Sequence, residues 1–261
     1  MCATGIERSA FGRLTCPPLR PGADRYCGVV TARPRNRPGG RLRDPVKPKP
    51  PPSLDLATLP DHDLDNESTF ERLGFYDIDL SQRSAESVEF TQCRFRGADL
   101  SGTQVDRVGL TDCLAENSNL ANVRADAGAL VRVRFVMSRM TGFTVAKGLL
   151  RDVEFEECRL DLSGWRFTDF QATRFINCNL TRADFTEADL TGAQFVGCDL
   201  TGAQFDKAKM EGTRFRKCVL VDIGGVLSWR GATVDGNDLI ALSYTLAHAL
   251  GIRIEADPAT Q

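Results

Sequence analysis

The chain has 261 residues, of which 42% are hydrophobic, and no stretch approaches the ~18 consecutive apolar residues of a membrane span. Its formal net charge of −2 conceals two opposed parts. Residues 1–54 carry eleven Lys and Arg against three acids, whereas residues 55–261 carry 22 basic and 32 acidic side chains. We therefore expect no membrane association, and the two parts need separate explanations.

Residues 1–52 have the composition of a segment without a stable fold. Ten of the twelve prolines lie there, including the run KPKPPP at 47–52. Such a segment cannot bury enough apolar area to offset the entropy lost on ordering, so we predict a disordered basic extension rich in Pro and Arg. No apolar run of about 7–15 residues follows the charged start, which argues against a signal peptide. It is either an unstructured extension, such as one translated from a start codon set too far upstream, or a tail for an anionic partner.

Residues 53–67 (SLDLATLPDHDLDNE) are predicted to form an N-terminal cap. A repeated structure needs caps, because its terminal coils otherwise expose apolar surface and a strand edge. Four leucines have the spacing to cover a first open coil, namely Leu54, Leu56, Leu59 and Leu64.

The segment 68–235 is dominated by a period of five. Of the 31 positions from Phe70 to Leu220 that are multiples of five, 28 hold Leu, Phe, Met, Val or Trp. The exceptions are Ala85, Ala115 and Ala125. This period fits neither a 3.6-residue helix nor a two-residue strand, and it indicates an internally repeated solenoid.

A slower period of twenty sets the number of units in each turn. Two residues before each large apolar residue the chain prefers a small one, as in ADLSG (98–102) and ADFTE (183–187). Like residues then recur every twenty positions. One column reads Leu80, Leu100, Leu120, Met140, Leu160, Leu180, Leu200 and Leu220, and another reads Phe75, Phe95, Ala115, Phe135, Phe155, Phe175, Phe195 and Phe215. Four units per square turn, with small and large residues both pointing inward, explain both periods.

On these units the chain resembles the pentapeptide-repeat family over residues 68–235. The resemblance implies an all-β fold, a right-handed quadrilateral parallel β-helix of about eight coils. The pattern is weakest early and midway, where Arg83 with Ala85, Leu114 with Ala115, and Phe143 depart from it. At these units we expect bulges or irregular backbone.

The C-terminal end contains a predicted capping helix over 236–251, followed by a tail over 252–261. The segment GATVD at 231–235 closes the repeats, and Asn237 or Asp238 offers an N-cap. Apolar residues at helical spacing follow, and Gly251 fits a C-terminal stop. They are Leu239, Leu242, Leu246 and Leu250. The same helix is compatible with a homodimer contact at this end.

Cysteine and histidine often form catalytic or metal-binding sites, but their positions in this sequence do not indicate such a site. Six of nine cysteines occupy the small inward position, so we expect packed free thiols in a reducing cytoplasm. They are Cys93, Cys113, Cys158, Cys178, Cys198 and Cys218. The two histidines, His62 and His248, fall at opposite ends of the predicted rod and cannot share a site. We therefore predict a protein that is not an enzyme, without catalytic, cofactor-binding or metal-binding residues.

Two functions fit such a rod. The first is a protein-binding scaffold. The second comes from the resemblance: the quinolone-resistance branch of the family uses an acidic rod as a mimic of DNA that occupies a type II topoisomerase such as DNA gyrase. The net charge of −10 over residues 55–261 favours mimicry, but most columns mix signs. Glu86, Asp106 and Asp126 stack in one column, for example, and Arg166 follows in it. Scaffolding is the preferred reading, and neither function requires direct binding of nucleic acid.

Overall fold

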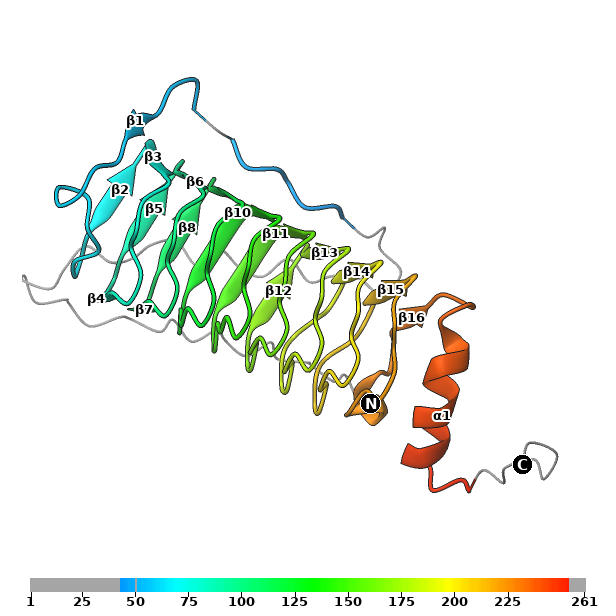
Figure 1. Ribbon diagram of the computed structural model, residues 1–261. Coiled ribbons are helices and arrows are strands. Elements are labelled where there is room, and N and C mark those ends of the chain that lie inside the picture. Colours follow the sequence, from blue (N-terminus) through cyan, green and yellow to red (C-terminus); the bar gives the residue numbers. More distant parts are fainter. Residues whose placement is uncertain (1–42, 50, 254–261) are drawn as a thin grey trace, which may run out of the picture. The chain divides into compact units, whose positions relative to one another are not determined.

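The computed structural model describes residues 43–49 and 51–253, and these form a parallel β-solenoid followed by a short helix (Figure 1). The strands pair into one 14-stranded sheet and one two-stranded sheet, and every pairing is parallel. The strands are β1 Asp55–Leu56, β2 Thr69–Glu71, β3 Leu73–Tyr76, β4 Ser84–Glu86, β5 Glu89–Thr91, β6 Arg94–Arg96, β7 Gln104–Asp106, β8 Gly109–Thr111, β9 Leu114–Glu116, β10 Ala129–Val136, β11 Leu149–Glu156, β12 Asp169–Gln171, β13 Arg174–Ile176, β14 Gln194–Val196, β15 Arg214–Arg216 and β16 Thr233–Val234. A 3-10 turn, η1, spans Val226–Ser228, and the helix α1 spans Leu239–Ala249.

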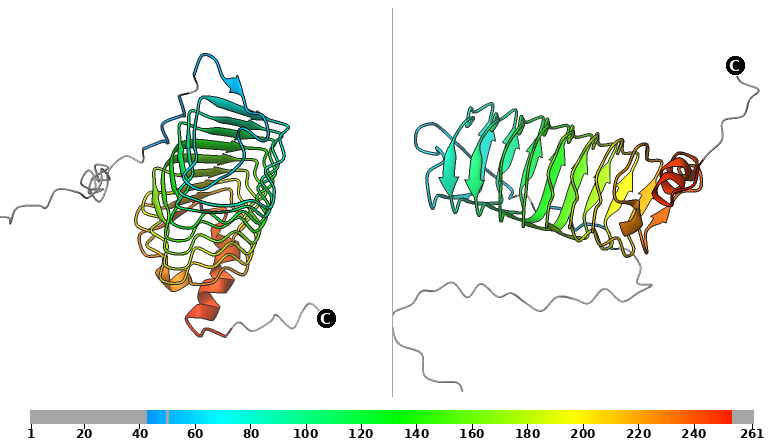
Figure 2. Two further views of the ribbon diagram at one scale, coloured as in Figure 1. Left: turned by 90° about the vertical axis from the view of Figure 1, so that its left-hand side faces the viewer. Right: turned by 90° about the horizontal axis from the view of Figure 1, so that it is seen from below.

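From β2 to β15, paired residues differ by twenty in number, as the slower sequence period predicts. Phe155 pairs with Phe175 between β11 and β13, and Phe175 pairs with Phe195 between β13 and β14. Seen along its length, each coil is roughly four-sided (Figure 2). The predicted quadrilateral parallel β-helix is therefore confirmed.

The ladder residues fill the interior in stacked columns. In the phenylalanine column, rings one coil apart stack nearly parallel with centroids 4.8–5.0 Å apart. Trp229 continues this column beyond Phe215 at 4.5 Å, although it lies off the five-residue ladder. Three buried threonine hydroxyls at small positions, those of Thr103, Thr168 and Thr213, donate to carbonyl groups of the preceding coil, as Thr213 does to Leu190 at 2.7 Å. Such bonds remove the cost of burying a polar group.

Each corner of the coil has a residue in the left-handed backbone region. Some corners hold glycine, such as Gly102 at φ 68°, which adopts this conformation without a steric cost. However, most corner residues are not glycine, and their φ values run from 47° to 61°. Their N–H groups donate to the next coil, as Asn177 does to Val196 at 2.8 Å, and this hydrogen bond offsets the local strain. The repeat thus sets the corner conformation whatever the side chain.

The irregular units keep regular backbone pairing, so the expected bulges are not found there. Leu114 pairs with Arg134, and Ala115 pairs with both Phe95 and Phe135. The departures show instead as empty space, because an apolar cavity of about 60 Å³ lies between the rings of Phe95 and Phe135 and beside Ala125. A short side chain in the ladder therefore leaves a void and does not shift the register.

At the N-terminal end, β1 pairs with β3 and extends the sheet across the first coil. Of the four leucines expected to cover that coil, Leu64 is buried, whereas Leu56 and Leu59 are exposed. Arg83, which occupies a small position, turns outward and donates from Nε to Asp63 at 2.7 Å. This hydrogen bond lowers the pKa of Asp63 and joins the cap segment to the second coil.

At the C-terminal end, α1 lies across the last coil (Figure 2). Asp238 occupies the N-cap position, but its carboxylate accepts the N–H of Cys218 at 2.8 Å and makes no bond to the helix. Gly251, in the left-handed region, donates to His248 at 3.0 Å and ends the helix as predicted. Within residues 43–49 and 51–253, no helix combines the length and apolarity needed to span a membrane.

Candidate interaction surfaces

Residues 43–49, here called the strap, lie along one long edge of the solenoid (Figure 1). The backbone N–H of Val46 donates to Asp152 at 3.0 Å, and that of Lys49 donates to Asp112 at 3.1 Å. The Arg43 guanidinium also donates to Asp152. The strap lies inside the extension expected to be disordered, and side chains more than sixty residues away hold it in place. Residues 1–42 and 50 lie outside the described residues.

The strap follows a corner column of the solenoid, here called the corner ladder. Its members are Gln92, Asp112, Arg132 and Asp152, one from each successive coil. Arg132 donates to both carboxylate oxygens of Asp112, at 2.7 and 2.6 Å. This side-chain hydrogen bond, helped by the Lys49 N–H, holds the pKa of Asp112 below its usual value despite burial. Asp112 is thus a charged acceptor fixed in place by the neighbouring coil.

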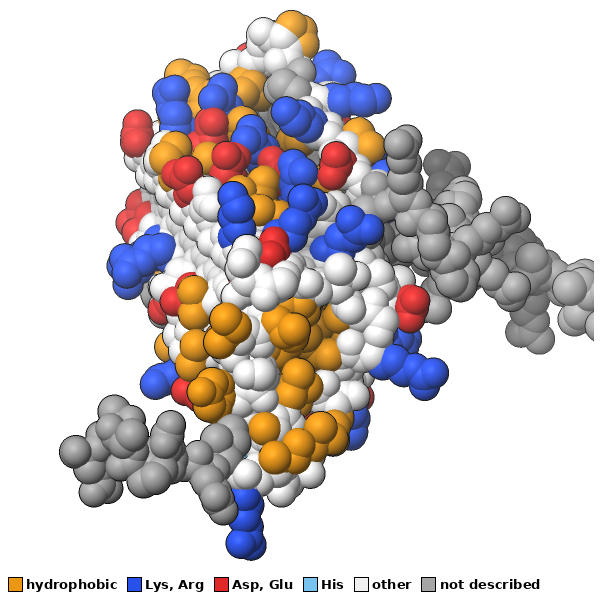
Figure 3. Space-filling model, turned by 90° about the vertical axis from the view of Figure 1, so that its right-hand side faces the viewer, with side chains coloured by type: hydrophobic (Ala, Val, Ile, Leu, Met, Phe, Trp, Pro, Cys, Tyr) orange, Lys and Arg blue, Asp and Glu red, His pale blue; other side chains and the backbone are white. Residues whose placement is uncertain are grey.

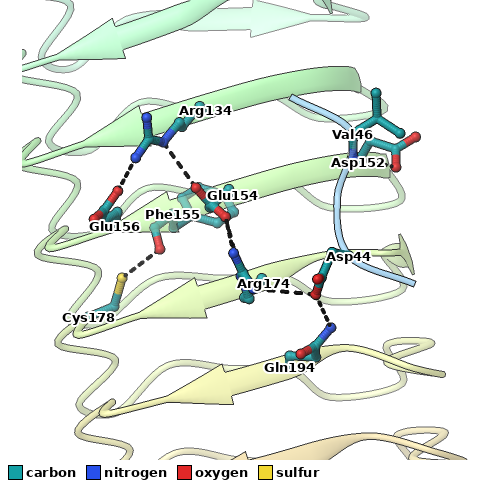
Figure 4. Close-up of polar contacts among 10 residues, drawn as sticks. All are labelled: Asp44, Val46, Arg134, Asp152, Glu154, Phe155, Glu156, Arg174, Cys178 and Gln194. Carbon is teal, nitrogen blue, oxygen red and sulfur yellow. Dashed lines mark hydrogen bonds and ion pairs between the residues drawn. The ribbon is translucent and has the colours of Figure 1, made fainter. Parts of the chain in front are cut away.

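A network of ion pairs lies on the wall next to the corner ladder (Figure 4). Glu154 on β11 is largely buried and accepts from Arg174 at 2.8 Å, while Arg134 Nε lies 3.0 Å from its other oxygen. Arg134 also pairs with Glu156. The strap enters this network, because Asp44 accepts from Arg174 at 3.3 Å. Charges on this wall are mutually neutralised and do not form a run of one sign.

An apolar face lies at the C-terminal end of the solenoid, where Figure 3 shows hydrophobic side chains grouped together. Leu242 of α1 is buried against the last coil with 4% exposure, and Leu246 packs beside it. The opposite side of the helix exposes Ile240 at 73% and Tyr244 at 62%, and Leu227 of η1 is 76% exposed. We call Leu227, Leu239, Ile240, Tyr244 and Leu250 the end face. The helical leucines are therefore divided: Leu242 and Leu246 cap the coil, and Leu239 and Leu250 stay exposed.

The six cysteines of the small position are buried free thiols, as predicted. Cys178 donates to the Phe155 carbonyl at 3.5 Å, and Cys218 donates to that of Phe195 at 3.5 Å. A hydrogen bond with Cys158 lowers the pKa of Cys178, but the hydrogen bond with Cys198 and burial outweigh it and raise the value to about 12. A thiol that stays protonated at neutral pH is a poor nucleophile and metal ligand, so Cys178 serves packing. At the end of the column, the hydrogen bond with Cys198 lowers the pKa of Cys218, which is also buried.

The histidines lie far apart on the solenoid. His62 contacts Thr58 in the N-terminal cap, with Nδ1 3.1 Å from the Thr58 nitrogen, and His248 sits in the last turn of α1. Over the described part of the chain, no group of three His, Cys, Asp or Glu side chains is arranged to hold a metal ion. The absence of catalytic, cofactor and metal sites stays a prediction.

Comparison with protein families agrees with this geometry. The family model for pentapeptide repeats matches in eight copies, over residues 75–112, 166–202 and 183–220. The chain is a pentapeptide-repeat protein. The unmatched stretch at 113–165 of this pentapeptide-repeat protein contains Ala115, Ala125 and Phe143, which depart from the ladder pattern, yet its coils pair regularly. No curated protein matches the sequence.

Solved structures of other pentapeptide-repeat proteins are similar to this one. A trypsin-treated variant of QnrB1, a plasmid-mediated fluoroquinolone resistance protein, is 20% identical with a TM-score of 0.37, over 72% of this chain and 100% of that one. HetL, involved in heterocyst differentiation regulation in the cyanobacterium Nostoc, is 17% identical with a TM-score of 0.25, over 64% of this chain and 85% of that one. Likeness at this level says nothing about what the present chain binds.

Proposed function

We propose that this pentapeptide-repeat protein is a non-enzymatic, rod-like scaffold that binds other proteins. The observation that supports it best is the end face. Clustered apolar side chains exposed on a stable element commonly mark a protein–protein contact. The buried free thiols fit a reducing compartment, and we place the protein in the cytoplasm for that reason.

A second copy of the chain is the occupant that we propose for the end face. An apolar surface at the end of a rod can be covered by the same surface of a second copy related by a twofold axis, which closes the assembly as a dimer. Leu242 does not belong to this contact, because it is already buried against the last coil. The expected product is two rods joined through their C-terminal ends.

Light scattering of the purified full chain tests the proposed dimer. The expected mass is twice the chain mass of 28.7 kDa, and it should persist at high salt because the contact is apolar. Ile240→Asp should give monomers with an unchanged melting temperature, and Lys207→Asp, on the exposed solenoid surface, is the matched control. A wild-type monomer, or a dimer untouched by Ile240→Asp, would remove the end face as the self-association site.

The alternative function is that of an acidic DNA mimic that occupies DNA gyrase. The net charge of −10 over residues 55–261 supports it, since a basic DNA groove attracts an acidic rod. On the wall next to the strap, acidic side chains are paired with arginines, so their charges cancel. That wall is therefore a poor candidate for the surface that imitates DNA. A gyrase supercoiling assay at micromolar protein separates the two: inhibition or quinolone protection favours mimicry, and no effect removes it.

A further inference from the structure

The strap meets the corner ladder with a regular spacing. The two backbone donors, Val46 and Lys49, are three residues apart in the strap. Their acceptors, Asp152 and Asp112, are forty residues apart, which is two coils of the solenoid. A third bond, in which Gln92 Nε2 donates to the Lys49 carbonyl at 3.4 Å, continues the contact to the next coil.

The two spacings agree because of the geometry of each partner. A polyproline II segment repeats every three residues and rises about 3.1 Å per residue, so one repeat advances about 9 Å. Adjacent parallel strands are about 4.8 Å apart, so two coils also advance about 9.6 Å. Each donor directly follows a proline, Pro45 or Pro48, and a proline ring favours this conformation. The corner ladder therefore matches every third N–H of an extended, proline-spaced chain.

Charge and packing add selectivity to this spacing. Arg43, three residues before Val46, forms an ion pair with Asp152, whose side chain is only 8% exposed. Pro45, Val46 and Pro48 line a small pocket together with Val133 of β10. A neutral or acidic segment would cover the Asp152 carboxylate and leave it buried without a cation, which costs free energy.

We propose that the corner ladder is a binding site for an extended basic segment with the pattern Arg-x-Pro-x-x-Pro-x, and that the strap is its built-in occupant. A partner protein carrying an extended segment of this chemistry binds by replacing the strap. The site adds a second surface to the proposed scaffold and does not depend on the end face. Release of the strap thus controls access to the ladder.

The test supplies the strap sequence as a separate peptide. The probe is a fluorescent peptide of residues 41–52 (RLRDPVKPKPPP), and the protein is the full chain carrying Arg43→Gln, Val46→Pro and Lys49→Pro. The two new prolines remove the N–H donors while keeping an extended backbone. Fluorescence anisotropy should show the peptide binding at least about tenfold more tightly to this variant than to the wild-type chain, where the tethered strap competes at high effective concentration.

Further substitutions locate the bound peptide. Adding Asp112→Asn and Asp152→Asn to the strap variant should abolish binding, whereas Asp106→Asn, an exposed carboxylate on β7, should leave it unchanged. A peptide with Pro45 and Pro48, the prolines directly before the two donors, replaced by alanine should bind several-fold more weakly. Absence of binding to a strap variant that melts like the wild type would overturn the proposal, as would binding that survives loss of both aspartates.

Amide hydrogen exchange gives a second, independent measurement on the otherwise unmodified chain. Asp152→Asn should accelerate exchange at Val46 by roughly tenfold, because the acceptor of its N–H loses charge. An unchanged rate would mean that the strap is not held by the ladder. Repeating the peptide titration in an Ile240→Asp background separates this result from the fate of the proposed dimer, since binding should be the same there.

Discussion

The coils before residue 130 and those after residue 150 follow the same repeat but pack differently. In the later coils every ladder residue from Leu150 to Phe215 is almost completely buried, and the aromatic rings stack without interruption. In the earlier coils Leu100 and Leu110 are only partly buried, and the phenylalanine column is broken at Ala115 beside a cavity of about 60 Å³. Backbone pairing is nevertheless equally regular in both regions.

This difference shows that register and packing are separable in a solenoid. Backbone hydrogen bonds between coils fix the register, so a missing ring costs packing energy locally and leaves the neighbours in place. Contacts from outside the repeat reach both regions. The strap bonds to Asp112 in the earlier coils and to Asp152 and Arg174 in the later ones, and β1 covers the first coil.

The largest expected effect is at Phe175, which is fully buried between Phe155 and Phe195. Phe175→Ala should lower the free energy of unfolding by about 3–5 kcal/mol, as expected for a buried Phe. Phe95→Ala should cost less, because Phe95 already borders empty space and has fewer contacts to lose. Urea denaturation measures both, with exposed Phe167→Ala as a near-neutral control. Equal costs at the two buried sites would contradict the packing difference.

Adding an aromatic ring where the phenylalanine column is interrupted should stabilise the earlier coils. Ala115→Phe places a ring between Phe95 and Phe135, fills the cavity, and should raise the free energy of unfolding by about 1–2 kcal/mol. Ala203→Phe, at a fully buried small position of the later coils, is the matched control and should destabilise by about 1–3 kcal/mol. Thermal unfolding reports the sign of each. If Ala115→Phe also destabilises, the cavity is not large enough for a ring.

The smallest expected effect is the pH dependence contributed by Asp112. Its folded-state pKa is lowered, so its charged form stabilises the fold above the unfolded-state pKa of about 3.9, and this contribution is lost as pH falls through the folded value. The stability difference between wild type and Asp112→Asn should therefore shrink as pH drops below about 4. Chemical denaturation at several pH values checks this. A difference that stays constant down to pH 2 would mean that Asp112 carries no linked proton.

The sequence predicts the core well because a solenoid repeats one local rule. The ladder from Phe70 to Leu220, the period of twenty and the inward cysteines all follow from spacing, and their burial is confirmed, Leu100 and Leu110 being only partly covered. The left-handed corners were not predictable from residue type, because Phe167 and Asp112 share a conformation usually left to glycine. Trp229 was missed because it completes the phenylalanine column from outside the period.

The interaction surfaces were harder to predict, and the reason is physical. The composition of residues 1–52 shows only that the segment has few apolar groups. It does not reveal that the three-residue spacing of Pro45 and Pro48 matches two aspartates that lie two coils apart. The signal was present in the order Pro45, Val46, Pro48, Lys49, but it has meaning only beside Asp112 and Asp152. The end face was predictable only in part. Helical spacing identified the leucines of α1, but it did not show which of them are buried and which are exposed.

The two-coil interval between Asp112 and Asp152 also limits how the rod can change length. Insertion or deletion of twenty residues elsewhere adds or removes one whole coil and leaves every other layer intact. The same event between residues 112 and 152 moves one carboxylate by a coil height of about 4.8 Å relative to the strap, and one N–H loses its acceptor. The strap therefore acts as a ruler that fixes the coil count of this stretch, while the coils beyond its last contacts, at Arg174 and Gln194, are free to gain or lose members.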